Sequence, residues 1–268
     1  MRDTRGLLGS WCLPDPARPE YDDSPRMEKS FRDRLDLIEE EHWWYRARQL
    51  ILERAIDRLV GHPERSLAIG VGAVREAEWL SRRTHLVAID KAQISKRCAE
   101  LALAVQSDAA ALPFSDGAFD AAFILDVLEH IEADDVVLQE IRRVLRPGGS
   151  LLITVPAFMF LYGRQDRMSE HKRRYRRRDL MRLVERLGLE VQYCTYFNTL
   201  LFPPIAAIRV ARRWLKLPDG EGRTDFDMRL PHPVERLLEN ALAAERHAIA
   251  RIVLPFGVSL LCSARRAL

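Results

Sequence analysis

The chain has 268 residues, of which 47% are hydrophobic, so it is long and apolar enough to form one large packed domain. Its 42 basic and 39 acidic residues nearly cancel, and net charge alone therefore favours no class of partner. The four cysteines contain no CxxC pair, which argues against a disulfide framework and against a zinc site, and we expect no metal.

The N-terminal residues 1–25 are rich in proline, aspartate and arginine and lack the apolar run of a signal peptide. We expect them to form a flexible leader. The apolar stretches at 199–210 and 252–262 are shorter than the roughly 18 residues of a membrane span, although they allow contact with a membrane surface. Together with the cysteine pattern, this predicts a cytoplasmic protein.

Apolar residues recur at helical spacing from about Arg26 to Val60, and Gly61 and Pro63 end this pattern. Short apolar segments then alternate with amphipathic ones. Strands are expected at 66–71, 85–90, 101–106, 118–126 and 150–156, and helices at 76–83, 91–101 and 134–145. This alternation predicts a doubly wound α/β fold whose ligand site lies at the carboxyl ends of parallel strands.

The second half of the chain continues the pattern with a helix at 178–189 and a strand at 190–198. Residues 199–255 interrupt it with prolines and helical material, and a last strand comes after them. The expected organisation is a helical segment at 26–62, a core at 63–198, a helical insertion or cap at 199–255 and the final strand of the core at 256–268.

Glycines and carboxylates follow three of the expected strands. Gly70 and Gly72 come after the first strand, Asp90 ends the second about 20 residues later, and Asp108 follows the third. Each of these residues alone also fits a turn or a helix cap. In this order they indicate a nucleoside ligand, with Asp90 on the ribose and Asp108 near the base.

The stretch SDAAALPFSDGAFDAAFILDVLEHIEADDVVLQEIRRVLRPGGSLLITVP, residues 107–156, resembles the class I S-adenosylmethionine-dependent methyltransferases. EHWWYRAR (41–48), HKRRYRRRDL (171–180) and LPFGVSLLCSAR (254–265) are similar to a subgroup associated with modification of glycans, cell envelopes or secondary metabolites. The resemblance implies a Rossmann-like, seven-stranded, mostly parallel sheet with helices on both faces. It also implies an N-terminal helical lid and S-adenosylmethionine as the cofactor.

Two positions depart from the family's first motif. Ala68 stands where an acidic residue is usual, and Val74 stands at the place of a third glycine. The missing carboxylate removes a charged hydrogen bond worth roughly 1.5–3 kcal/mol. The chain is therefore either a methyltransferase with a remodelled site or a degenerate member, such as a partner subunit or an enzyme of other chemistry.

The resemblance assigns a set of residues to the cofactor. They are Trp44, Tyr45, Arg48, Gly70, Gly72, Arg75, Asp90, Asp108, Ala109 and Asp126. Arg75 either contacts the cofactor's carboxylate or is a solvated residue of a first helical turn. The aromatic residues of EHWWYRAR either cover the cofactor or pack into the core.

Methyl transfer to a hydroxyl requires a base, and His171 is the preferred candidate because its unshifted pKa lies near neutrality. Asp126 and His130 are the other catalytic candidates. Each of the three also fits a plain structural role. Asp126 fits a turn cap, His130 a packed helix residue, and His171 a surface imidazole.

The run from Arg164 to Arg178 is strongly basic and predicts a small acidic acceptor, such as a phosphate- or carboxylate-bearing sugar, lipid or metabolite. Tyr162, Arg173, Arg174 and Tyr175 are the expected acceptor-binding residues. Nucleic-acid methylation is a weaker alternative, because few aromatic residues accompany these arginines. The insertion at 199–255 covers the acceptor pocket, forms a homodimer contact or touches a membrane surface.

Overall fold

The computed structural model of the protein describes residues 42–71, 74–91, 94, 96–215 and 230–268. The expected leader, the start of the helical segment and Gly72 lie outside the described residues. The sheet, its helices and the candidate site all belong to the described ranges.

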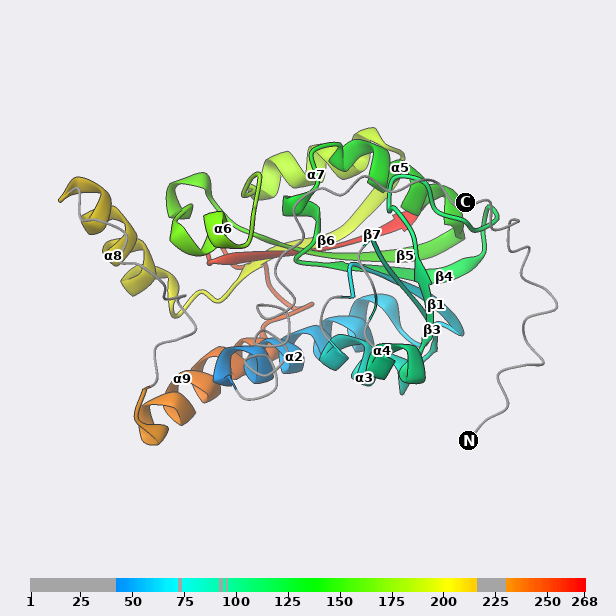
Figure 1. Ribbon diagram of the computed structural model, residues 1–268. Coiled ribbons are helices and arrows are strands. Elements are labelled where there is room, and N and C mark those ends of the chain that lie inside the picture. The colour runs from blue at the N-terminus through cyan, green and yellow to red at the C-terminus, as the bar shows by residue number, and fades with distance from the viewer. Residues whose placement is uncertain (1–41, 72–73, 92–93, 95, 216–229) are drawn as a thin grey trace.

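A seven-stranded sheet with the order β3-β2-β1-β4-β5-β7-β6 forms the centre of the molecule (Figure 1). Strand β7 runs antiparallel to both of its neighbours, and the remaining pairs are parallel. The strands are β1 (Arg65–Ile69), β2 (His85–Asp90), β3 (Leu103–Gln106), β4 (Phe119–Leu125), β5 (Leu145–Pro156), β6 (Leu189–Phe197) and β7 (Ser259–Arg266). The predicted mostly parallel α/β sheet is confirmed.

Helices cover both faces of this sheet, with α5 and α7 on one side and α2, α3 and α4 on the other (Figure 1). Their bounds are α2 (Trp43–Ala55), α3 (Val74–Ser81), α4 (Lys96–Leu101), α5 (Asp134–Val144), α6 (Arg164–Met168), α7 (Arg177–Arg186), α8 (Phe202–Trp214) and α9 (His232–Ala244). Helix α2 continues through the π-helical turn η2 (Ile56–Val60) and ends before Gly61, whose φ of 84° interrupts the helical backbone. Short 3-10 turns are η3 (Leu128–His130), η4 (Met159–Leu161) and η6 (Glu245–His247).

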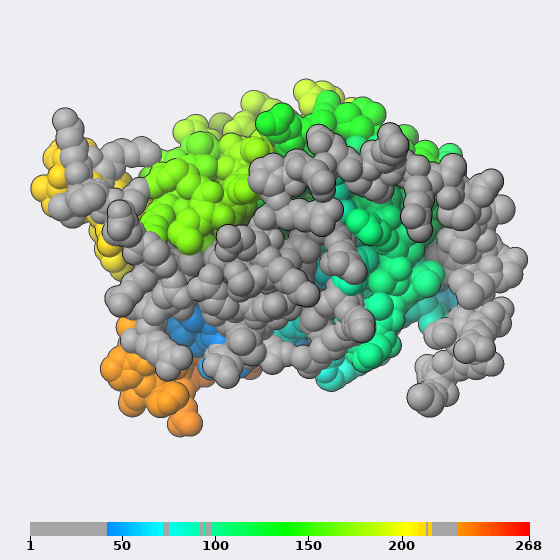
Figure 2. Space-filling model, viewed as in Figure 1, coloured from blue at the N-terminus to red at the C-terminus, as the bar shows by residue number. Residues whose placement is uncertain are grey.

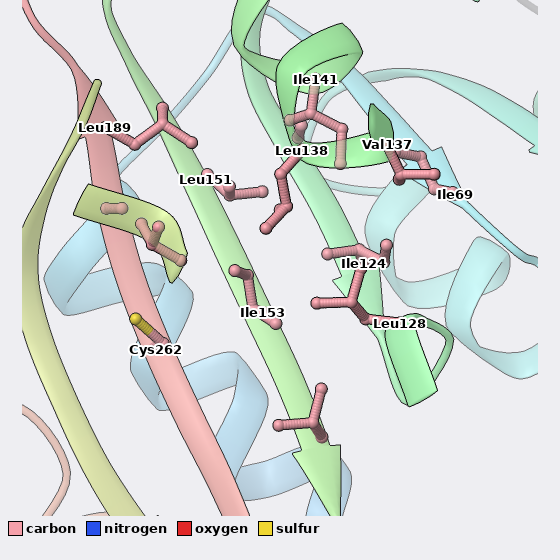
Figure 3. Close-up of a cluster of buried hydrophobic side chains, with 14 of the residues drawn as sticks. Ile69, Ile124, Leu128, Val137, Leu138, Ile141, Leu151, Ile153, Leu189 and Cys262 are labelled. Carbon is pink, nitrogen blue, oxygen red and sulfur yellow. The ribbon is translucent and has the colours of Figure 1, made fainter. Parts of the chain in front are cut away.

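Two apolar clusters form the core, one on each face of the sheet. Alternation along β1 divides its side chains between them, because Leu67 and Ile69 belong to the cluster beneath α5 and Ala68 to the other. Helix α5 repeats its buried residues at helical spacing and lays them over Ile124 and Ile153 (Figure 3). Both faces of the sheet are therefore covered. A ligand can approach the sheet at the ends of its strands.

The insertion contributes helices α8 and α9, which differ in how they pack against the rest of the protein. Helix α9 packs against α2, where Arg46 forms an ion pair with Glu239 at 2.6 Å. Helix α8 projects away from the sheet, and its Trp214 is 86% exposed (Figure 1). Within the described ranges, no helix combines the length and the apolar character that crossing a bilayer requires.

Candidate active site

The carboxyl ends of β1, β2 and β3 bring the predicted nucleoside-binding residues to one edge. The backbone N–H of Gly70 donates to the carbonyl of Ile89 at 2.8 Å, so the loop after β1 lies against the end of β2. Asp90 ends β2, and its carbonyl accepts from the N–H of Ser107 at 3.0 Å. Asp108 therefore lies next to the end of β2, as the sequence predicted.

Asp108 already has partners in the protein. Its carboxylate accepts from the N–H of Ala110 at 2.9 Å and lies 3.2 Å from the ammonium of Lys91. These contacts form a turn that fixes Ala109 beside the carboxylate. Side chain and backbone are thereby held at the strand edge, where a carboxylate can accept from an exocyclic amine and a backbone N–H can donate to a ring nitrogen.

Gly70 has a left-handed backbone with φ of 72°. A Cβ atom at this position would lie 2.4 Å from Cγ2 and 2.7 Å from Cγ1 of Val127. The residue must be glycine for two reasons, the backbone angle and the close approach of the turn after β4.

Arg48 of α2 joins the lid helix to this edge. Its guanidinium lies 2.6 Å from Glu76 of α3, 2.6 Å from Asp126 after β4 and 3.3 Å from the hydroxyl of Thr154 on β5. Arg48 is only 5% exposed, and its buried Nε has no hydrogen-bond partner. The guanidinium therefore holds Glu76 and Asp126 together at this edge.

Burial and ion pairing act against each other in this cluster. Burial lowers the pKa of Arg48, but Asp126 and Glu76 raise it above the usual arginine value. Burial has the opposite effect on an acid and raises the pKa of Glu76, although the ion pair with Arg48 opposes this change. Glu76 and Thr154 were not among the predicted site residues, because their roles depend on a contact with a distant helix.

The predicted lid residues meet the first helix after the glycine loop. Arg75 donates to the side-chain oxygen of Gln49 at 2.8 Å, and the Trp44 ring lies 5.7 Å from the Arg48 guanidinium carbon. Between α2 and α3 there is a small pocket. It is lined by Tyr45, Arg48, Gln49, Leu52, Arg75, Glu76 and Trp79. Helix α2 thus contacts α3, with Arg48, Tyr45 and Arg75 at their junction.

Asp126, Glu129 and His130 follow β4 in a tight turn. Asp126 has φ of 55°, and its N–H donates to the carbonyl of Thr154 at 2.9 Å, which fixes the turn on β5. Glu129 and His130 lie in η3, and the His130 ring meets the His171 ring edge-on at 4.6 Å. The structure therefore brings the three predicted catalytic residues to one region.

Asp166 fixes the orientation of His171. The carboxylate lies 2.9 Å from His171 Nδ1, and contacts with His171 and Arg174 hold the pKa of Asp166 well below its usual value despite its burial. An ionised carboxylate only accepts hydrogen bonds, so Nδ1 carries the proton of this hydrogen bond. Nε2 faces Glu129, whose Oε1 is 3.9 Å away.

Glu129 is an uncommon buried acid. It is 1% exposed, and neither carboxylate oxygen has a hydrogen-bond partner. Burial raises its pKa well above the usual value, and the nearby Asp126 raises it further. Burial, followed by the nearby His171, lowers the pKa of His130 to about 4, so this ring is neutral near pH 7.

The predicted acceptor-binding residues have partners within the protein. Arg174 pairs with Asp166 at 2.7 and 3.0 Å, while Arg173 and the Tyr175 hydroxyl contact Asp134 at 3.0 and 2.8 Å. The Tyr162 hydroxyl donates to the carbonyl of His171 at 2.8 Å. These contacts build the segment that carries His171, and direct binding of an acceptor by these residues stays a prediction.

With this geometry established, residues 67–153 match the model of the family described as a methyltransferase domain. This segment, about a third of the chain, is thus similar to the methyltransferase-domain family.

Two curated relatives are similar to this chain. A probable S-adenosylmethionine-dependent methyltransferase of Mycolicibacterium smegmatis is 29% identical over 58% of this chain and 62% of its own length. Methyltransferase GfsG of Streptomyces halstedii is 33% identical over 54% of this chain and 48% of its own. The chain thus spans about half to two thirds of the length of these relatives.

Among solved structures, the cyclase SpnF has the same fold. It is 21% identical, with a TM-score of 0.52 over 83% of this chain and 81% of its own. This similarity concerns the fold alone, because the fold also carries chemistry other than methyl transfer.

Proposed function

We propose that the protein transfers a methyl group from S-adenosylmethionine to a small acidic acceptor, such as a sugar, lipid or secondary metabolite. The position of Asp126 carries this proposal. It contacts Arg48 on the side of the cofactor residues and begins the turn that holds Glu129 and His130 near His171. One residue thus links the cofactor edge with a candidate base.

The residues present fit the cofactor. Asp90 suits the ribose hydroxyls, and Asp108 with Ala109 suits adenine. When bound, the cofactor supplies an electrophilic methyl group. The protein then has to align the acceptor and, for a hydroxyl, remove its proton.

His171 is the proposed proton acceptor. Asp166 accepts from its Nδ1–H, and Nε2 faces Glu129 in the region after β4. A carboxylate that orients the ring and stabilises its cationic form makes a histidine a better base.

His171→Ala is expected to lower turnover about 10²–10⁴-fold, the usual contribution of a general base, while the affinity for S-adenosylhomocysteine stays unchanged. Turnover is measured as methyl transfer from labelled S-adenosylmethionine to a panel of sugar phosphates, uronic acids and phenolic acids. His232→Ala is the control, because the His232 side chain is 96% exposed. Full turnover in His171→Ala would assign the proton transfer to another residue.

A second candidate function is a methyltransferase fold without methyl transfer, as a partner subunit or an enzyme of other chemistry. Ala68, 4% exposed within an apolar cluster, lacks the usual carboxylate, and the cyclase SpnF offers a precedent in the same fold. Restoring both residues in Ala68→Asp/Val74→Gly distinguishes the candidates by calorimetry. About a tenfold gain in cofactor affinity supports a weakened methyltransferase, and no gain supports the second candidate.

A small acceptor is also favoured over nucleic acid. Arg173 and Arg174 are paired with Asp134 and Asp166, so their charges are matched within the protein. Neutralising Arg176, Arg177 and Arg178 is therefore expected to leave methyl transfer to small acceptors unchanged. Tight, salt-sensitive RNA or DNA binding that these substitutions abolish would instead support the nucleic-acid alternative.

A further inference from the structure

Glu129, His130 and His171 form a compact group of metal-ligating side chains. One ligand atom from each lies within 4.8 Å of the other two. Two of the residues come from the turn after β4, and the third comes from the segment after α6. The part of the chain that the structure describes holds no other group of this kind.

The carboxylate of Glu129 lacks the partners that a buried acid normally has. Both oxygens are buried without a hydrogen-bond donor. The guanidinium groups close by are already engaged, Arg48 with Asp126 and Glu76 and Arg174 with Asp166. A buried, unpartnered carboxylate is unfavourable unless another group compensates it, and a bound cation would do so.

The two imidazoles have the orientation of metal ligands. The Nδ1 atom of His171 lies 2.9 Å from Asp166, while Nε2 points toward Glu129, and a carboxylate behind a histidine is a frequent arrangement in metal sites. The His130 ring meets the His171 ring edge-on at 4.6 Å, which brings both imidazoles to Glu129.

We propose that Glu129, His130 and His171 bind a divalent transition-metal ion such as Zn²⁺. Two nitrogen ligands and one oxygen ligand suit such an ion, and three protein ligands leave a position for water or an acceptor oxygen. Bonds of about 2.0–2.1 Å place two ligand atoms at most about 4.2 Å apart, so the side chains have to approach by several tenths of an ångström.

This site modifies the expectation that the protein needs no metal. That expectation rested on the cysteines, whereas the ligands here are a glutamate and two histidines from separate segments. Binding of the ion does not depend on the proposed methyl transfer. If both hold, the ion lowers the pKa of an acceptor hydroxyl, and His171 is then a ligand instead of the base.

The test is calorimetric titration of the full-length, tag-free, chelator-treated protein with Zn²⁺, with Mn²⁺ and Mg²⁺ in parallel. We expect equimolar Zn²⁺ binding. Glu129→Gln and His171→Ala are expected to lower the affinity at least 100-fold, and Asp166→Asn about 10–100-fold by misorienting His171. His247→Ala and His232→Ala are matched controls outside the cluster and should bind like the wild type.

Thermal melting separates loss of the site from loss of the fold. Glu129→Gln is nearly isosteric and leaves the buried position uncharged, so we expect this variant to melt at or above the temperature of the metal-free wild type. Equal Zn²⁺ affinity in the wild type and in folded Glu129→Gln, or no equimolar binding by the wild type, would overturn the proposal. Cofactor titration of the same samples tests methyltransferase function separately, because each ligand can bind without the other.

Discussion

At the scale of single residues, Gly70 and Gly61 form a natural matched pair. Both have positive φ, but a Cβ at Gly61 meets no atom within 4 Å, while one at Gly70 meets Val127. Gly61→Ala is expected to lower the free energy of unfolding by about 1–2 kcal/mol through backbone strain alone. Gly70→Ala should lower it further, as measured by urea denaturation, and equal losses would show that Val127 moves aside without cost.

Arg48 and Arg46 offer a second comparison on one helix. Arg48 is buried against Glu76 and Asp126, whereas Arg46 pairs with Glu239 of α9. Arg48→Lys keeps the charge but loses the planar fork, so we expect about a tenfold loss of cofactor affinity by calorimetry. Arg46→Lys should bind the cofactor like the wild type. Equal affinities in both variants would remove Arg48 from the cofactor site.

Residues that follow strands were predictable, while those fixed by distant contacts were not. Gly70, Asp90 and Asp108 follow consecutive strands, and the strand order of a parallel sheet places them together. Thr154 and Asp166 have no comparable signal in the sequence. Their roles come from a buried position and from a partner on another segment, and no local pattern encodes either.

At the scale of elements, α5 holds the turn before β4. Glu140 accepts from the N–H of Leu112 at 2.9 Å and pairs with Arg143, which donates to the carbonyls of Leu112 and Phe114. The hydrogen bond from Arg143 lowers the pKa of Glu140, although partial burial opposes this change. The ionised carboxylate thus ties the helix to the turn.

This link between α5 and the turn makes stability depend on pH. Because the folded pKa lies below the unfolded value, ionised Glu140 stabilises the fold above pH of about 4.5, and this stabilisation is lost as the pH falls through the folded pKa. Glu140→Gln should therefore lose less stability than the wild type between pH 5 and pH 3, in urea denaturation at each pH. Parallel pH curves for the two proteins would contradict this assignment.

The elements themselves follow apolar periodicity, and the differences have local causes. Strand β5 begins at Leu145, before the predicted start at 150, because Leu145 pairs with Phe119 across a bulge. The helix α6 lies inside the basic run, where no apolar spacing announces it. Asp166, in its first turn, accepts from the N–H of Gly163 at 2.7 Å and so supports the start of this helix.

At the scale of the whole molecule, the lid helix and part of the insertion act together. Helix α9 supports α2 through Arg46 and Glu239, and α2 in turn carries Arg48 into the site. Figure 2 shows α8 and α9 as separate projections at the same end of the molecule. The sequence predicted a helical insertion, but its support of the lid depends on tertiary packing.

Calorimetric titration of the full-length protein with S-adenosylmethionine and S-adenosylhomocysteine tests the central claim most directly. We predict equimolar binding of both ligands and a rise in melting temperature with ligand concentration, because a ligand that binds only the folded state stabilises it. No binding of either ligand at millimolar concentration would contradict the account, since Arg48, Asp90 and Asp108 would then hold no cofactor.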